Sequence, residues 1–575
     1  DLKIHIQPDK DSRTLTISDN GIGMTKEELE KNLGTIARSG SLDFKTENQS
    51  DNIDIIGQFG VGFYSAFMVA DKVTVVTRAY GSDTAYQWVS TGADGYTITE
   101  TEKDTVGTDV IMHIKEDESG EKYSTYLENW KLMMLIRKYS DYVRWPIVMD
   151  VEQSDWVDTG EKDEKGEPKM EMVTKTEEQT INSMVPIWQR SRKEATDEEC
   201  IAFYKDKFHD KDDPLAVIRV NAEGLISYRA LLFIPAKAPA NMFTRESDPG
   251  LELYSSGVMI MDKCTDLLPP CYAFARGVVD SPDLSLNISR EMLQHDRQLK
   301  FIAGNLEKKI KTELQKLMDN DREKYEKFFA AFGPQIKYGV LADYGAKKET
   351  LQDLLLYWSS KQGKLISLKE YVAAMPEDQK YIYYANGESR EALLQLPQME
   401  KLQQKGCDVL FMTDEVDGFV PQTLAKYQEK ELKAITAGDL GLETEEEKKA
   451  AEEKSEKSKQ TLEFVKKTLG EQVKDVRLSD NLGSHPVSVV PDGGMTFEME
   501  KYFKRMNPEA GMKADRILEL NADHPIFAKL QIAVAQDEKK AEDLVKILYT
   551  QALLMAGLPV ENAGEYTDLV CSLIG

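Results

Sequence analysis

A glycine-rich stretch at residues 57–65 contains the residue types that bind phosphate groups. It reads Gly-Gln-Phe-Gly-Val-Gly-Phe-Tyr-Ser. Glycine permits positive φ and lets backbone amides approach a ligand closely. The apolar residues 63–70 predict a helix after the glycines, and free N–H groups at a helix N-terminus attract negative charge. The stretch therefore indicates an anion site, although a flexible surface loop has a similar composition.

An acidic residue and two glycines occupy a predicted strand-to-helix turn nearer the start of the chain. Thr14–Ser18 alternates as a strand does, and Asp-Asn-Gly-Ile-Gly-Met follows at 19–24. Thr25 and Glu28 form a capping-box pattern, which predicts that a helix begins there. A buried carboxylate at Asp19 would accept a hydrogen bond from an exocyclic amine such as that of adenine. The alternative is a surface Asp-Asn-Gly turn.

The wording and order of these motifs resemble the ninety-kilodalton heat-shock chaperone family. The matching stretches are DNGIGM at 19–24, LGTIARSG at 33–40 and GQFGVGFYS at 57–65. DNA gyrase, histidine kinases and MutL share the same Bergerat ATP-binding fold, but the chaperones are the closest in wording. The resemblance implies an α/β multidomain protein with a Bergerat-type α/β sandwich ATP-binding domain, an α/β middle domain and an α+β C-terminal dimerisation domain.

The resemblance also implies a nucleotide site for ATP. In the family, the aspartate and a strand threonine bind adenine, the turn glycines and methionine shape the floor, and the glycine-rich amides hold the phosphates. Arg38 occupies the position where the family usually has lysine. Arginine keeps the positive charge, but its guanidinium group is wider than the lysine ammonium. The segment between Gly40 and Gly57 would be a lid over bound ATP. The predicted nucleotide-binding residues are Asp19, Gly21, Gly23, Met24, Asn32, Arg38, Ser39, Gly40, Gly57, Gln58, Phe59, Gly60, Val61, Gly62, Phe63 and Thr108.

Leu286–Gln294 resembles the catalytic loop of the middle domain in the same family. Arg290 would reach the γ-phosphate when the domains close, because its planar, permanently charged fork suits phosphate oxygens. An Arg–Glu surface pair is the alternative. The family's water-activating glutamate and its Mg²⁺-binding asparagine lie on a helix upstream of Asp1. We therefore predict no metal ligand in this chain and near-background ATP hydrolysis by it.

The elements that position these residues divide the chain into five predicted segments, because 575 residues are too many for one core. They are an ATP-binding domain at 1–153, truncated at its start, a charged linker at 154–179, a middle domain at 180–440, a charged helical connector at 441–460 and a dimerisation domain at 461–575. The short linker resembles the bacterial HtpG type of the family. Periodicity predicts strands at 1–6, 14–18, 73–78, 85–89, 107–114, 230–235, 379–385, 408–412, 473–478, 487–490 and around Phe419, and helices at 126–143, 301–341 and 495–512.

Composition narrows the function. The net charge of −27 argues against a nucleic-acid-binding surface, and no apolar run of about 18 residues predicts a membrane span. The five cysteines are scattered without a Cys-x-x-Cys pair, and the six histidines form no His-Glu-x-x-His motif. This pattern argues against structural zinc or a disulfide framework and favours the cytoplasm.

We therefore interpret the chain as an ATP-dependent, homodimeric chaperone of unfolded or partly folded client proteins, with a dimer contact at 537–574. The alternatives are another Bergerat-fold ATPase of topoisomerase or MutL type, and a nucleotide-binding holding chaperone without hydrolysis. A soft apolar helix surface suits client binding, although plain core packing explains the same residues. The candidate client-binding residues are Trp188, Met495, Phe497, Met499, Phe503 and Met506.

Overall fold

The computed structural model describes residues 2–36, 60–162, 168–239, 250–284 and 297–574. The chain divides into two compact units. The first contains Asp1–Pro269 and Ala273–Ile310, and the second contains Pro270–Tyr272 and Lys311–Gly575. The division falls inside helix α6 (Arg297–Asn320). None of the helices in these described ranges combines the length and the apolar composition needed to cross a membrane.

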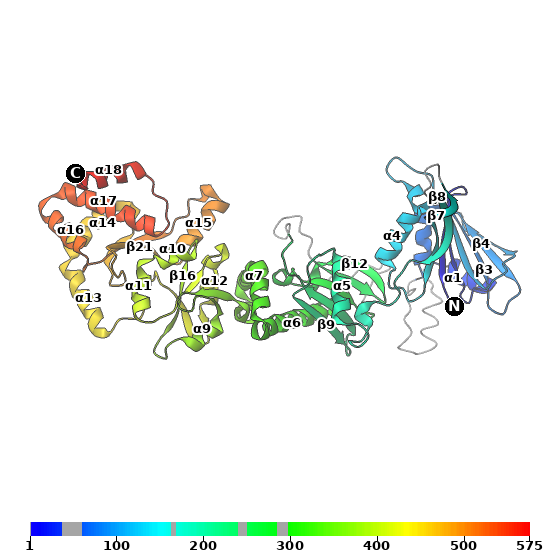
Figure 1. The fold of residues 1–575 in the computed structure, drawn as a ribbon, viewed down its shortest axis with the longest axis horizontal. Helices are drawn as coiled ribbons and strands as arrows, with labels where there is room; N and C mark the ends of the chain where they lie inside the picture. Colours follow the sequence, from blue (N-terminus) through cyan, green and yellow to red (C-terminus); the bar gives the residue numbers. More distant parts are fainter. Residues whose placement is uncertain (1, 37–59, 163–167, 240–249, 285–296, 575) are drawn as a thin grey trace. The chain divides into compact units, whose positions relative to one another are not determined.

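An eight-stranded, largely antiparallel sheet opens the first unit (Figure 1). Its strand order is β5-β4-β3-β6-β2-β1-β7-β8. Its strands are β1 (Ile4–Asp9), β2 (Thr14–Asp19), β3 (Ala70–Arg78), β4 (Ala85–Ser90), β5 (Tyr96–Thr101), β6 (Gly107–Ile114), β7 (Ile147–Lys162) and β8 (Pro168–Thr180). The strands expected from alternation near residues 4, 14, 73, 85 and 107 are confirmed.

One face of this sheet is covered by helices α1 (Lys26–Leu33) and α4 (Asn129–Tyr139). Leu29 of α1 and Ile136 of α4 are buried against Val73, Met112 and Met149 of the strands. The N-terminus of α1 has the predicted capping box, in which Thr25 and Glu28 each bond the other's backbone N–H. The cap fixes the point at which the chain leaves β2 and turns onto the sheet.

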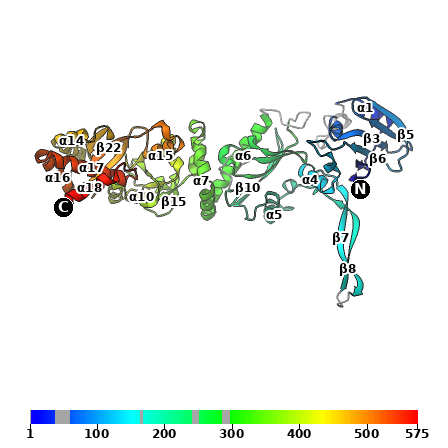
Figure 2. The ribbon, with the colours of Figure 1, turned by 90° about the horizontal axis from the view of Figure 1, so that it is seen from above.

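The predicted linker at 154–179 forms a hairpin instead of a flexible connection. β7 pairs with β1 in parallel at Ile4↔Ile147 and continues far beyond the sheet, paired antiparallel with β8 from Val148↔Thr180 to Asp158↔Met170. Figure 2 shows this hairpin extending from the sheet. The charged, glycine-containing composition suggested a linker, but backbone pairing between adjacent strands does not require apolar side chains.

A second sheet in the first unit has the order β12-β11-β13-β10-β9. Helix α5 (Asp197–Phe208) packs on it through Cys200 and Tyr204, which are buried with Leu231 and Phe233 of β10. The strands are β9 (Ala216–Ala222), β10 (Tyr228–Ile234), β11 (Leu251–Ser255), β12 (Val258–Cys264) and β13 (Arg276–Asp280).

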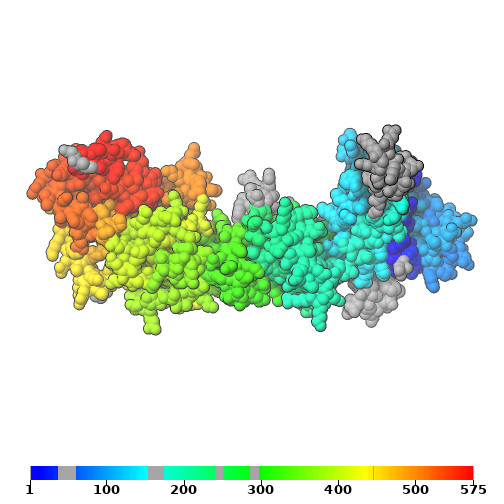
Figure 3. Space-filling model, viewed as in Figure 1, coloured from blue at the N-terminus to red at the C-terminus, as the bar shows by residue number. Residues whose placement is uncertain are grey.

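The second unit contains a six-stranded sheet, β15-β14-β17-β16-β19-β18, and a three-stranded sheet, β20-β22-β21. The strands are β14 (Leu356–Ser359), β15 (Leu365–Ser367), β16 (Tyr381–Asn386), β17 (Leu410–Met412), β18 (Lys426–Tyr427), β19 (Lys430–Ala434), β20 (Asp475–Leu478), β21 (Val487–Asp492) and β22 (Asp515–Leu520). Figure 3 shows the last helices, in red, forming a continuous surface with the orange segments before them.

Helices surround both sheets of the second unit. They are α7 (Arg322–Gly345), α8 (Lys348–Leu351), α9 (Leu368–Ala374), α10 (Arg390–Leu394), α11 (Pro397–Gln404), α12 (Val420–Leu424), α13 (Glu445–Lys457), α14 (Lys459–Leu469), α15 (Phe497–Met506), α16 (Pro525–Gln536), α17 (Glu538–Met555) and α18 (Ala563–Ile574). The mixture of sheets and helices in both units confirms the predicted α/β multidomain class. The charged connector at 441–460 is largely helical, as expected.

The strand predicted around Phe419 is wrong. Phe419 lies between a 3-10 turn at Glu415–Gly418 and helix α12. Asp414 and Asp417 form a capping box across that turn, and Pro421 occupies the first turn of the helix. Both features favour helical backbone over a strand.

A charged cluster is buried in the second unit beside α7. Lys337 is only 3% exposed, and its Nζ donates hydrogen bonds to Asp414 Oδ2 at 2.7 Å and Asp417 Oδ2 at 2.8 Å. The ammonium also lies 4.8 Å from the centre of the Tyr357 ring. Asp417 is fully buried, and this burial raises the pKa of its carboxyl while Lys337 opposes the rise. The two charges must therefore stay paired for the fold to tolerate them.

Candidate functional site

Three neighbouring strands of the first sheet point alternate side chains into the core. On each strand this inward-pointing row of side chains is apolar and ends in a polar residue. β2 ends its row with Asp19, β3 with Thr77 and β6 with Thr108. The apolar members of the rows are Leu15 and Ile17 of β2, Val73 and Val75 of β3, and Val110, Met112 and Ile114 of β6. Because strand side chains alternate between faces, the three polar residues lie on the core face of the sheet.

The register of the sheet places these three residues side by side. Asp19 lies opposite Thr108, and Thr108 lies opposite Thr77. The hydroxyls of Thr77 and Thr108 are 3.0 Å apart. Directly opposite residues have Cβ atoms about 5 Å apart. The structure thus brings together Asp19 and Thr108, which lie 89 positions apart in the sequence, and adds Thr77.

The turn at 20–24 is fixed by contacts with β3. The backbone N–H of Met24 donates to Thr77 Oγ1 at 2.9 Å, and the N–H of Tyr80 donates to the Ile22 carbonyl at 2.7 Å. Thr77 is completely buried, so its hydroxyl is committed to this network. Sequence reasoning missed Thr77. Its position at the end of an inward apolar row was the signal that could have found it.

Two glycines allow the backbone to approach closely at this site. Gly23 has φ +66°, and a Cβ there would lie 1.9 Å from the Arg78 carbonyl oxygen. Gly107 has φ +122°, and a Cβ there would lie 2.1 Å from the Asp19 carbonyl oxygen. A side chain at either position would push the turn away from the sheet. Gly107 was not among the predicted residues, whereas Gly23 was.

The Asp19 carboxylate is exposed, so the prediction that it would be buried is wrong. Its Oδ1 accepts a hydrogen bond from the Gly21 N–H at 2.9 Å. The carboxylate is accessible because β2 ends at Asp19 and no further inward residue of that strand covers it. An accessible acceptor beside two buried threonine hydroxyls is an arrangement that can bind a polar ligand group.

Helix α1 carries Asn32 toward its C-terminal end. The Asn32 Oδ1 is shielded from solvent and has no hydrogen-bond partner among the described residues. The neighbouring residue Leu33 accepts a hydrogen bond at its carbonyl from the Tyr64 hydroxyl at 2.8 Å. Burial raises the pKa of the Tyr64 phenol, which keeps it a donor. This bond joins the end of α1 to the segment that follows the glycine-rich stretch.

The helix predicted after the glycines is much shorter than expected. A 3-10 turn spans Gly62–Ser65, helix α3 covers only Ala66–Val69, and β3 begins at Ala70. The Phe63 ring packs 5.4 Å from the ring of Trp88, which anchors the turn on β4. A helix of one turn contributes little dipole, so anion binding here would depend on individual backbone N–H groups.

Several predicted site residues lie outside the described residues. They are Arg38, Ser39, Gly40, Gly57, Gln58, Phe59 and the catalytic-loop residue Arg290.

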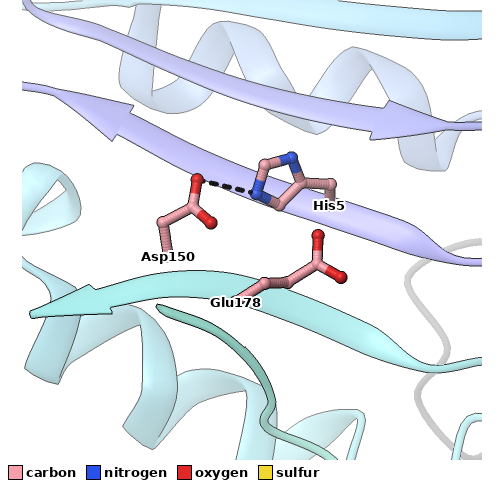
Figure 4. Close-up of side chains that lie close together, drawn as sticks. All are labelled: His5, Asp150 and Glu178. Carbon is pink, nitrogen blue, oxygen red and sulfur yellow. Dashed lines mark ion pairs between the residues drawn. The ribbon is translucent and has the colours of Figure 1, made fainter. Parts of the chain in front are cut away.

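One group of possible metal ligands occurs among the described residues, formed by His5, Asp150 and Glu178 (Figure 4). Their ligand atoms lie within 4.8 Å of one another. The group does not fit a metal that accompanies a nucleotide at Asp19. His5 follows Ile4, which is opposite Asp19, so His5 lies on the other face of the sheet. Glu178 is also paired with the Lys3 ammonium at 2.6 Å.

The structure corrects the candidate client surface. Trp188, Phe497 and Met499 are 7%, 9% and 6% exposed, so they belong to the core and we remove them from that surface. Tight packing explains their apolar character. Met506 is 68% exposed, and the partly buried Phe503 stacks edge-on against Phe419.

Comparison with known proteins identifies the class. Residues 1–120 match the family model "Histidine kinase-, DNA gyrase B-, and HSP90-like ATPase", and residues 151–575 match "Hsp90 protein". The chain belongs to the Hsp90 family, whose members are ATP-dependent chaperones. Because the second model covers the middle and C-terminal parts, the topoisomerase and MutL alternatives are set aside.

Within the Hsp90 family, the chain is similar to curated bacterial relatives. Chaperone protein HtpG of Bacillus subtilis (strain 168) is 52% identical over 573 residues, covering 99% of this chain and 90% of the relative. Chaperone protein HtpG of Clostridium perfringens (strain 13 / Type A) is 50% identical over 575 residues, covering 100% and 90%. The predicted resemblance to the bacterial HtpG type is therefore confirmed.

Proposed function

We propose that this chain is an ATP-driven chaperone of the HtpG type whose nucleotide site is centred on Asp19. The observation that carries the proposal is the polar cluster at the ends of three inward rows, beside a turn held by Gly23 and Thr77. Every member of this cluster is fixed by the sheet. A ligand therefore meets a preorganised set of groups and does not have to order them.

In the proposed complex, the Asp19 carboxylate accepts a hydrogen bond from the exocyclic amine of adenine. An ionised acceptor makes a stronger hydrogen bond than a neutral one. The flat base lies beside the turn that contains Gly21 and Gly23. Thr108 supports the aspartate from the adjacent strand. Asn32, whose Oδ1 no described residue bonds, lies on the ribose and phosphate side.

The phosphates are proposed to bind the backbone amides of the glycine-rich stretch, of which Gly60, Val61 and Gly62 are described. Gly60 has φ +63°, a conformation that lets consecutive N–H groups turn toward one anion. Mg²⁺ is proposed because this ion commonly binds through substrate phosphates. The described residues near Asp19 supply no ligand set for it.

Thr77→Val is expected to weaken ATP binding by about tenfold while the first unit stays folded. The substitution preserves the shape of the side chain but removes the hydroxyl that accepts from Met24 N–H, and losing such a bond costs about 1–3 kcal/mol. Isothermal titration calorimetry with ATP measures the affinity. Thr99→Val, on β5 of the same sheet, is the control. Equal affinity in the Thr77 variant and the native protein would show that the turn does not need this anchor.

Arg290→Ala is expected to lower ATP turnover by roughly 10²-fold or more, with little change in ATP affinity, in a protein that carries the family's water-activating glutamate and Mg²⁺-binding asparagine. A charged fork that meets the γ-phosphate only on closure stabilises the transition state more than the open complex. Turnover and nucleotide binding are measured in parallel. A large loss of affinity would make Arg290 a ground-state ligand instead.

Client binding and dimerisation complete the proposal. Unfolded or partly folded proteins are the proposed clients, bound by a homodimer joined through the C-terminal domain in the cytoplasm. Binding of a permanently unfolded, fluorescently labelled protein tests this function when measured with and without ATP. The proposed function is supported if ATP changes the affinity for the unfolded protein in the native chain but not in the Asp19→Asn variant. An affinity that ATP leaves unaltered contradicts it.

A further inference from the structure

A cavity of about 400 Å³ in the first unit is lined by four arginines. They are Arg190, Arg192, Arg219 and Arg229, and we call this cavity the arginine groove. It lies beside β9 and β10, and it is lined by residues outside the nucleotide site. The concentration of positive charge is notable in a chain whose net charge is −27.

The antiparallel register explains why two of the arginines share one face of the sheet. Arg219 of β9 lies opposite Leu231, and Arg229 of β10 lies opposite Asn221. Opposite residues point to the same face, so Arg219 and Arg229 are diagonal neighbours there. Diagonal neighbours are about 7 Å apart, within reach of one multivalent ligand.

The other two arginines are positioned by the short 3-10 helix at Ile187–Gln189. Trp188 Nε1 and Gln189 Nε2 donate to Asp280 Oδ2 at 3.1 and 2.9 Å, which ties this helix to the end of β13. Arg229 also donates to the Gln189 carbonyl at 2.9 Å. Arg190 and Arg192 follow immediately, and both are exposed.

The positive charge of the groove is only partly balanced by nearby carboxylates. Of the described residues that line it, Glu194 is the acidic one, and its carboxylate accepts from the Ser191 N–H at 2.9 Å. Arg219 bonds the Ala195 carbonyl and Asp197, but its Nε is shielded and has no hydrogen-bond partner among the described residues. Four guanidinium groups and one carboxylate therefore line the groove, while Asp197 pairs with Arg219 and Asp280 lies opposite Arg229 just outside the lining.

The groove also has an apolar residue in its lining and lies beside the edge strand of its sheet. Ile187 contributes partly exposed apolar surface next to Arg190, whereas Val220 and Leu231 are buried. β9 is the last strand in its sheet, and an edge strand can accept an extended peptide through its backbone. The volume lies in the range of about 300–1,000 Å³ typical of ligand sites.

The geometry points to a binding site for an acidic segment of polypeptide, in which two or more carboxylates alternate with apolar side chains. The carboxylates pair with the guanidinium forks, and an apolar side chain of the segment lies against Ile187. The site is built without any residue of the nucleotide site, so this inference stands whether or not the proposed ATP chemistry is correct.

Fluorescence anisotropy tests the inference with a fluorescein-labelled peptide of alternating Glu and Leu, added to the full 575-residue chain. The matched peptide carries Gln in place of every Glu. Arg190→Gln combined with Arg192→Gln is expected to weaken binding of the acidic peptide at least tenfold, because each charge-assisted hydrogen bond contributes about 1.5–3 kcal/mol. Both residues are exposed, so the thermal midpoint should not change.

The control variant combines Arg137→Gln with Arg144→Gln, which removes the same charge from exposed positions in the first unit. Its affinity should stay within twofold of the native value. Equal losses in the two double variants would show general attraction to positive charge and overturn the proposal. Equal binding of the Gln peptide would also overturn it. Inorganic phosphate that displaces the acidic peptide better than chloride at the same ionic strength would assign the groove to small oxoanions instead.

Discussion

Asp19→Asn is expected to reduce ATP affinity by roughly 30- to 1,000-fold while leaving the sheet intact. The substitution converts a charged acceptor of the adenine amine into a neutral amide. Losing a charge-assisted contact of this kind costs about 2–4 kcal/mol. The fold should survive, because the introduced amide side chain still offers an oxygen to the Gly21 N–H and the position is exposed.

Calorimetry with ATP measures the affinity, and circular dichroism checks the fold. Asp94→Asn is a matched control, because Asp94 is an exposed aspartate between β4 and β5 of the same sheet. The control should bind ATP as the native chain does. An unchanged affinity in the Asp19 variant would show that Asp19 does not bind adenine. The cluster of Asp19, Thr77 and Thr108 would then have only a structural role.

Lys337→Met is expected to lower the free energy of unfolding of the second unit by about 3–5 kcal/mol at neutral pH. Removing one partner of a buried pair leaves the other charge unpaired in the interior. Here that charge is Asp417, which is fully buried. Urea unfolding, monitored by circular dichroism, gives the difference.

The same variant should show a diagnostic pH dependence. Burial raises the pKa of Asp417, and without the ammonium the main charge that opposes this rise is gone. A carboxyl whose folded pKa is raised destabilises the fold as pH increases above its unfolded pKa of about 3.9. The loss caused by Lys337→Met should therefore be smaller near pH 5 than near pH 7.5.

Lys324→Met provides the comparison on the same helix. Its ammonium lies 3.4 Å from Asp321 in an exposed pair, so a change within about 0.5 kcal/mol is expected. A cost for Lys337→Met equal to that of Lys324→Met would show that water reaches the buried cluster. A pH-independent cost would show that Asp417 does not carry the effect.

The sequence predicted local features well where local physics decides them. Alternation located β2, β3 and β6, and the Thr25–Glu28 pattern located the start of α1. Motif wording identified Asp19 and Thr108, and the register places them opposite each other.

Features that depend on tertiary partners could not be predicted. The sequence shows Thr77 at the end of an apolar row, but its closeness to Thr108 depends on the pairing of β3 with β6. A threonine in a strand is ordinarily only a good strand former. The exposure of Asp19 depends on where neighbouring strands end. The burial of Phe497 and Met499 depends on which face of α15 meets the core. The four arginines of the groove are spread over 40 positions, so only folding brings them together.

The parallel pairing of β1 with β7 has a consequence for the order of events during synthesis. Ile4 pairs with Ile147, so one neighbour of the first strand is made 143 residues after it. Non-local pairing of this kind is slow, because the entropy cost of closing a long loop comes before any stabilising contact forms. A growing chain can form the antiparallel ribbon of β1 and β2 early, but the open edge of β1 stays uncovered until β7 leaves the ribosome. The first sheet is thus completed late, and its exposed edge in the nascent chain can pair with other strands in the meantime.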